Sequence, residues 1–151
     1  MMPFDSYPGG GLTPLGKPKK RDNCRHGYGL ELQQLTRQTC CAYCGMDLVQ
    51  DYDHWLLLSV DHDVPRGQAI LLGVGIDLYE DFINLVVCCT GCNGYGNRYA
   101  VVSDPVQSWG VDAFIALRDR VFAERTVSIA SRRAAEQLFF RSAPWAAPSA
   151  T

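Results

Sequence analysis

The chain has 151 residues, of which 14 are Lys or Arg and 16 are Asp or Glu, so its formal charge is −2. An apolar fraction of 47% and a charged fraction of 20% are typical of a globular domain and exclude a disordered chain. The longest apolar run, residues 69–76, contains two glycines and is too short to span a bilayer. No export signal opens the sequence, so we expect a cytoplasmic domain without a membrane partner.

The charges are segregated along the chain. Residues 17–37 hold six basic residues against two acidic ones, residues 45–81 hold eight acidic residues against one arginine, and residues 111–141 hold six arginines against four acidic residues. Such a pattern suits cations at the centre and phosphate contacts at the margins. Solvated loops and helix faces explain it equally well, so the charge pattern alone does not decide between the two.

Three regions are expected in chain order. Residues 1–22 are rich in Gly, Pro and Lys and predict a flexible arm. Residues 23–103 predict a core with a short helix over 28–38, a strand at the end of the apolar run 55–60, and a second apolar segment at 84–88. Residues 69–76 are expected to be a loop or a second strand with a bulge.

Residues 104–151 predict a helical extension packed on the core, with two helices over about 112–141. Asp112 and Thr126 are the expected N-caps. The apolar residues expected to face the core are Phe114, Leu117, Val121, Leu138 and Phe139. Self-association is the alternative for this apolar stripe.

The cysteines form two Cys-x-x-Cys pairs, and such pairs hold structural zinc with four sulfur ligands. The expected ligands are Cys41, Cys44, Cys89 and Cys92. A redox-active pair and buried cysteines that bind no metal are the alternatives. Of the remaining cysteines, Cys40 and Cys88 are interpreted as packing residues and Cys24 as a surface thiol.

Between and around these pairs the sequence resembles the HNH endonuclease family. The resembling segments are Cys41–Gly45, Ser59–Arg66 and Asn84–Asn93, which stand in the family's order within residues 35–99. The resemblance implies an α+β fold with a ββα-metal (His-Me finger) core, a structural zinc, and metal-dependent hydrolysis of DNA that leaves 5′-phosphate ends. Double-stranded DNA is the expected partner.

The resemblance also implies residue roles. His62 is expected to be the general base, because an imidazole with a pKa near 6.5 accepts a proton from water at neutral pH. Asn84 is expected to fix the loop that orients His62. Asp61 and Asn93 are expected to hold a catalytic Mg²⁺ or Mn²⁺, which requires a bend that brings Asp61 and His62 into one site.

The chain departs from the family at Gly96, where relatives often carry Lys, and Arg98 is a candidate replacement. The candidate nucleic-acid contacts are Arg66, Arg98, Arg132 and Arg133. The alternative function is a zinc-stabilised module that binds nucleic acid or a protein partner without catalysis, and a thiol oxidoreductase is a third possibility. Asp63 is left outside the expected site.

Overall fold

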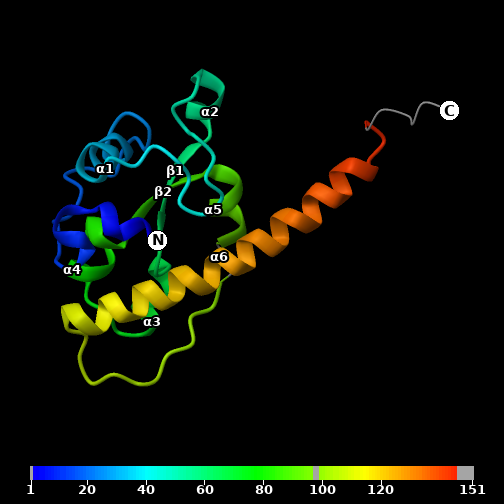
Figure 1. Ribbon diagram of the computed structural model, residues 1–151. Helices are drawn as coiled ribbons and strands as arrows, with labels where there is room; N and C mark the ends of the chain where they lie inside the picture. The colour runs from blue at the N-terminus through cyan, green and yellow to red at the C-terminus, as the bar shows by residue number, and fades with distance from the viewer. Residues whose placement is uncertain (1, 97–98, 146–151) are drawn as a thin grey trace.

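A computed structural model of the protein describes residues 2–96 and 99–145. Short helices surround one pair of strands, and a long helix crosses this body and extends beyond it (Figure 1). The elements are η1 (Pro3–Ser6), η2 (Pro8–Gly11), α1 (Tyr28–Thr36), α2 (Tyr52–Leu56), β1 (Leu58–His62), α3 (Arg66–Leu71), α4 (Ile76–Tyr79), η3 (Phe82–Asn84), β2 (Leu85–Cys89), α5 (Thr90–Gly96) and α6 (Val111–Ser142). The α+β class predicted from the sequence is confirmed.

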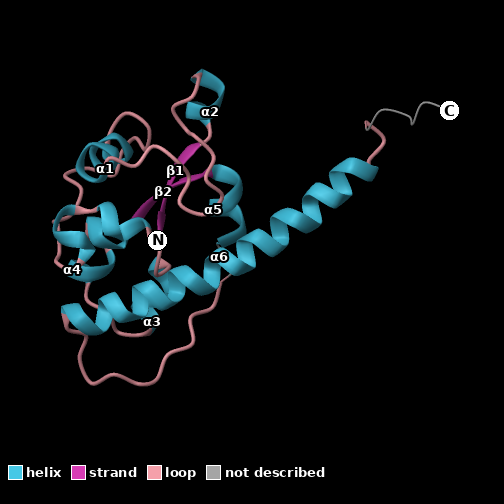
Figure 2. Ribbon diagram, in the orientation of Figure 1, coloured by secondary structure: helices cyan, strands magenta, loops and turns pink. Residues whose placement is uncertain are grey.

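Strands β1 and β2 pair in antiparallel orientation at the centre of the body (Figure 2). The register places Leu58 opposite Cys89 and His62 opposite Leu85. All five residues of β2 are buried, as expected for an apolar run covered on both faces, whereas β1 carries polar side chains at Ser59, Asp61 and His62. Helix α5 follows β2 without a linker and packs on both strands.

The connection between the strands differs from the expected loop or strand. Residues 69–76 contribute to two short helices, α3 and α4, and Gly73 stands between them with a φ of 76°. Glycine adopts this left-handed conformation without the steric cost that other residues meet. Of the apolar run, Ala69 and Val74 face the core, whereas Ile70, Leu71 and Ile76 are more than half exposed.

The C-terminal region is one helix of 32 residues and not two. The Thr126 hydroxyl donates to the carbonyl of Phe122, one turn earlier, so it is satisfied inside the helix and does not cap a second one. The helix starts at Val111 with Gly110 as N-cap, and Asp112 lies in its first turn. At 1.5 Å per residue, the helix is roughly 48 Å long, which is why it extends beyond the body.

Only the first part of α6 packs on the core. Phe114, Leu117 and Val121 are buried, as the sequence predicted. Leu138 and Phe139 are 68% and 66% exposed, so their predicted packing is wrong. They lie on the projecting half of α6, which has passed the body by that point (Figure 1). Among the described residues, no helix combines the length and hydrophobicity needed to cross a membrane.

The N-terminal segment differs from the expected flexible arm. Phe4 is 1% exposed, and its ring packs edge-on against Phe122 with 5.7 Å between centroids. The Tyr7 hydroxyl donates to the carbonyl of Leu85 in β2. Gly11 permits close packing, because a Cβ there would lie 2.8 Å from the carbonyl oxygen of Phe4. Two aromatic residues thus anchor a segment whose composition otherwise resembles a linker.

Candidate functional site

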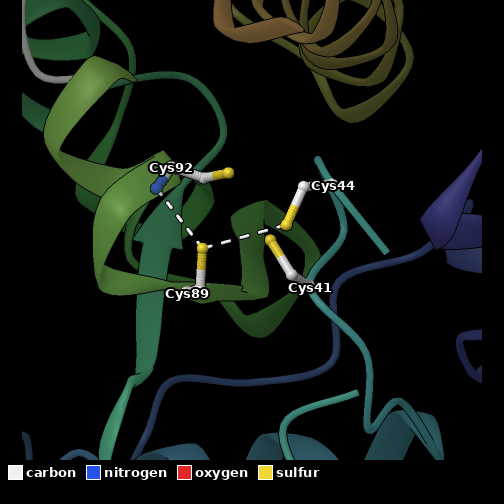
Figure 3. A group of neighbouring side chains, drawn as sticks. All are labelled: Cys41, Cys44, Cys89 and Cys92. Atoms are coloured by element: carbon white, nitrogen blue, oxygen red, sulfur yellow. Dashed lines mark hydrogen bonds between the residues drawn. The ribbon is translucent and has the colours of Figure 1, made fainter. Parts of the chain in front are cut away.

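The four predicted zinc ligands lie together. Their sulfur atoms are all within 4.8 Å of one another and face a common centre (Figure 3). Cys41 and Cys44 come from the turn after α1, Cys89 ends β2, and Cys92 lies in α5. The Sγ atoms of Cys44 and Cys89 are 3.9 Å apart, close to the ~3.8 Å expected between sulfurs of a tetrahedral zinc site with 2.3 Å bonds. The donor set therefore fits zinc.

Backbone geometry supports the cluster. The amide of Cys92 donates to the Cys89 sulfur at 3.4 Å. Gly45, with a φ of 74°, closes the first turn, and its amide donates to the carbonyl of Cys41 at 2.9 Å. Nη1 of Arg133 lies 3.7 Å from the Cys92 sulfur, where its charge offsets part of the negative charge of four thiolates. Arg133, a predicted DNA contact, therefore contacts the cysteine cluster.

The other three cysteines lie outside the cluster, and none of the seven is in a disulfide. Cys88 is buried, in agreement with a packing role. Cys40 is exposed, so its predicted packing role is wrong. It follows the exposed Thr39, and its backbone forms an isolated antiparallel β-bridge with that of Asp47. Cys24 is half-buried against the core and is not the surface thiol expected from the sequence.

His62 ends β1, and its side chain is 13% exposed at an open pocket. Its Nε2 atom lies 3.2 Å from Nη1 of Arg21 and 3.4 Å from Oε2 of Glu80. Burial, together with the positive charge of Arg21, lowers the pKa of His62 below its usual 6.5, although Glu80 opposes this. The imidazole is therefore neutral at neutral pH and able to accept a proton.

Asp61 does not share this pocket. No bend separates it from His62, since both pair in register with β2, so their side chains leave opposite faces of β1. The Asp61 carboxylate accepts a hydrogen bond from the Tyr43 hydroxyl at 2.8 Å and forms an ion pair with Arg125 at 2.6 Å. The expectation that Asp61 and His62 lie together at a bend is not met.

Arg125 lies on α6, is 1% exposed, and forms hydrogen bonds with three consecutive residues at the end of β1. Besides Asp61, its guanidinium donates to the carbonyls of His62 at 2.8 Å and Asp63 at 2.6 Å. The Asp63 carboxyl is buried, and burial raises its pKa well above the usual range. Asp63 thus neither faces water nor contributes a ligand to the cysteine cluster.

Asn84 is buried and forms hydrogen bonds with both ends of the connection between β1 and β2. Its amide nitrogen donates to the carbonyls of Val64 at 3.1 Å and Tyr79 at 3.0 Å, and its Oδ1 accepts from the amide of Val64 at 2.9 Å. These bonds fix the backbone that follows His62. Among the described residues, Asn84 makes no hydrogen bond to the His62 ring.

Asn93 lies in α5, and its amide nitrogen donates to the Ser59 hydroxyl at 2.8 Å. Ser59 and Asp61 are two residues apart on β1, so Asn93 lies on the Asp61 side of the sheet. A Mg²⁺ ion binds through carboxylates and waters, but Arg125 already neutralises the Asp61 carboxylate. As arranged here, Asp61 and Asn93 do not fit a catalytic Mg²⁺ or Mn²⁺ ion. Within residues 2–96 and 99–145, the four cysteines are the only group of three or more His, Cys, Asp or Glu side chains placed to hold a metal.

The remaining predicted contacts are dispersed. Arg66 lies at the His62 pocket, where its Nε is 3.2 Å from Glu80. Arg132 is on the outer half of α6, and Arg98 lies outside the described residues. Sequence reasoning missed Glu80 and Arg125. Arg125 had a signal, since it follows Phe114 and Val121 at helical spacing and so occupies the buried stripe of α6.

Comparisons of the chain with protein-family models, with curated proteins and with solved structures find no match. The functional assignment therefore depends on the geometry of the site and on the motif order in the sequence.

Proposed function

We propose that this protein is a zinc-stabilised HNH-type endonuclease that hydrolyses phosphodiester bonds of double-stranded DNA, with His62 as the general base. One observation carries the proposal: β1 pairs with β2 and α5 follows β2 directly, with His62 at the end of β1 and the cysteine cluster at the junction of β2 and α5. This pair of strands and its following helix support the proposal, together with the order of the motif residues in the sequence, which resembles that of the HNH family.

His62 has the properties that a general base needs. Its lowered pKa keeps the imidazole neutral, and its partial exposure lets a water molecule reach the ring. Asn84 supports this role by fixing the backbone at Val64, two residues after His62. A proton taken from the attacking water would reside on the imidazole while the phosphodiester bond breaks.

The divalent ion implied by the resemblance is a separate matter. Arg125 already neutralises the Asp61 carboxylate, so no step is assigned to that ion. The same ion pair favours a second candidate, a zinc-stabilised module that binds nucleic acid or a protein partner without cutting. The two candidates differ in what happens to DNA once it is bound.

The test is relaxation of supercoiled plasmid by the zinc-loaded protein, with Mg²⁺, with Mn²⁺ and with neither. We expect relaxation, and a rate at least ~100-fold lower in His62→Ala, because a general base contributes about 10²–10⁴-fold. His26→Ala is the matched control, since His26 is exposed and its ring lies beside Trp55. Zinc content measured on each protein shows that the fold is retained.

Full activity of His62→Ala would remove His62 as the base. A zinc-loaded protein that shifts DNA in a gel, but never cuts it with either ion, would favour the binding module. The reaction without added ions decides whether a divalent ion is needed. It must be run without strong chelators, which would also remove the structural zinc.

A further inference from the structure

The Glu80 carboxylate is the centre of a charged cluster beside His62. It forms ion pairs with Arg21 and with Nε of Arg66, the latter at 3.2 Å, and lies 3.4 Å from Nε2 of His62. These groups come from four places in the chain: the segment before α1, the end of β1, the first residue of α3 and the residue after α4. The fold thus gathers two arginines around one nearly buried carboxylate.

The cluster retains positive charge. Two guanidinium groups face one carboxylate, and His62 is neutral at neutral pH because its pKa is lowered. Arg21 is further held over the Tyr28 ring, 5.4 Å from its centroid. A carboxylate that holds two arginines without neutralising both leaves a preorganised site for an anion.

Hydrogen-bond donors are left over as well. Arg66 uses only Nε for Glu80, and its side chain is 62% exposed; within residues 2–96 and 99–145 its two Nη groups have no partner. Arg21 uses Nη1 for both Glu80 and His62. The forked N–H groups of arginine match the oxygens of a phosphate better than a single point charge does.

The shape of the site suits a group within a chain. These side chains line an open pocket of about 530 Å³, together with Tyr28 and Ile76. An open pocket admits a phosphate that is linked on both sides, and the Tyr28 ring and Ile76 provide apolar surface for a sugar or base. Lys19 and Lys20, exposed just before Arg21, extend the positive charge beyond the pocket.

We propose that this pocket binds a phosphate group of a nucleic-acid backbone, with Arg21 and Arg66 as its contacts and Glu80 as the internal counter-ion that holds both arginines in place. The proposal deepens the proposed function, because it places the substrate phosphate beside His62. It needs no cleavage to be tested.

The experiment follows the His62 ring signals by NMR in the zinc-loaded protein, without divalent ions. The probes are inorganic phosphate and a 12-base-pair DNA duplex, with sodium chloride at matched ionic strength as the blank. We expect saturable shifts with both probes and about tenfold weaker binding in Arg21→Gln and Arg66→Gln. Arg37→Gln, an exposed arginine at the end of α1, is the matched control and should bind within twofold of the unaltered protein.

Each other outcome overturns a stated part of the proposal. Shifts with inorganic phosphate but none with DNA would replace the backbone phosphate by a free phosphate as the ligand. Equal binding by all three variants, or no shift with either probe, would remove the pocket as a phosphate site. A protein that binds in this way but never cuts plasmid would support the pocket as a phosphate site and overturn only the endonuclease. Plasmid cutting that is unaffected by Arg21→Gln and Arg66→Gln would support the endonuclease and overturn the pocket as its phosphate site.

Discussion

Arg125 is the residue on which the arrangement of β1 depends most. A single guanidinium pairs with Asp61 and donates to two backbone carbonyls at the end of the strand. Because this ion pair is buried, removing either partner leaves a charge without compensation, whereas replacing both removes the problem. Arg125 is therefore the cation that pairs with Asp61, where the resemblance had implied a metal ion as its partner.

Replacing Arg125 by Met should lower the free energy of unfolding by about 3–5 kcal/mol, because Asp61 is then buried without a counter-ion. The double variant Asp61→Asn, Arg125→Met should recover part of this loss. Arg120→Met is the control, since Arg120 forms an exposed pair with Glu124 and such pairs contribute about 0–1 kcal/mol. Urea unfolding of the four proteins measures these differences; equal losses for Arg125 and Arg120 would contradict the structure.

His62 should titrate below pH 6.5, because burial and then Arg21 disfavour its charged form. Glu80 and Asp61 act in the opposite direction, so Arg21→Gln should raise the pKa of His62 and Glu80→Gln should lower it. His62 binds a proton more readily in the unfolded chain than in the folded protein. The free energy of unfolding should therefore fall as the pH decreases below 6.5, until the pH has passed the pKa of His62 in the folded protein. NMR titration of the ring measures the pKa, and a value above 6.5 would refute the predicted environment.

Helix α6 shows where local patterns fail at the level of an element. The sequence between Val111 and Ser142 contains neither Gly nor Pro, so nothing interrupts the helix, and Thr126 was a misleading capping signal. Apolar spacing correctly identified Phe114, Leu117 and Val121 as buried, but it could not show that α6 leaves the body of the protein after Ile129. Helical periodicity predicts which side of a helix is apolar, and tertiary structure decides how much of that side is covered.

The two halves of α6 should respond differently to substitution. Phe114→Ala removes a fully buried ring and should cost about 3–5 kcal/mol, because a cavity remains in the core. Phe139→Ala, which alters an exposed ring on the projecting half, should change stability by less than about 0.5 kcal/mol. Thermal unfolding of both variants tests this, and a large loss for Phe139→Ala would indicate that the outer half is covered after all.

At the scale of the whole molecule, the cysteine cluster joins distant parts of the chain. Cys41 and Cys44 lie in one turn, and Cys89 and Cys92 lie where β2 passes into α5. Both pairs could be predicted because the spacing within each pair is local. The partners of Glu80 and Arg125 could not, since they lie 14 to 64 residues away in sequence and no short motif records such contacts.

The adjacent cysteines Cys40 and Cys41 offer a direct test of the zinc site. Cys41→Ser should lose stoichiometric zinc and unfold at a lower temperature, because metal binding and folding are coupled. Cys40→Ser should keep one zinc per chain, since Cys40 is exposed and lies outside the cluster. Metal analysis and circular dichroism melts give both readouts; equal zinc loss in the two variants would argue against this ligand set.

The packing of Phe4 has a consequence for how the protein is made. The Arg118 guanidinium lies 3.8 Å above the Phe4 ring, and Phe122 packs beside it, although more than a hundred residues separate them in sequence. During translation, Phe4 leaves the ribosome long before α6 is synthesised, and its ring lacks the contacts with Arg118 and Phe122 until α6 emerges. A ribosome that stalls before residue 118 would hold a nascent chain in which Phe4 lacks its partners on α6, and exposed apolar surface of this kind is what chaperones bind.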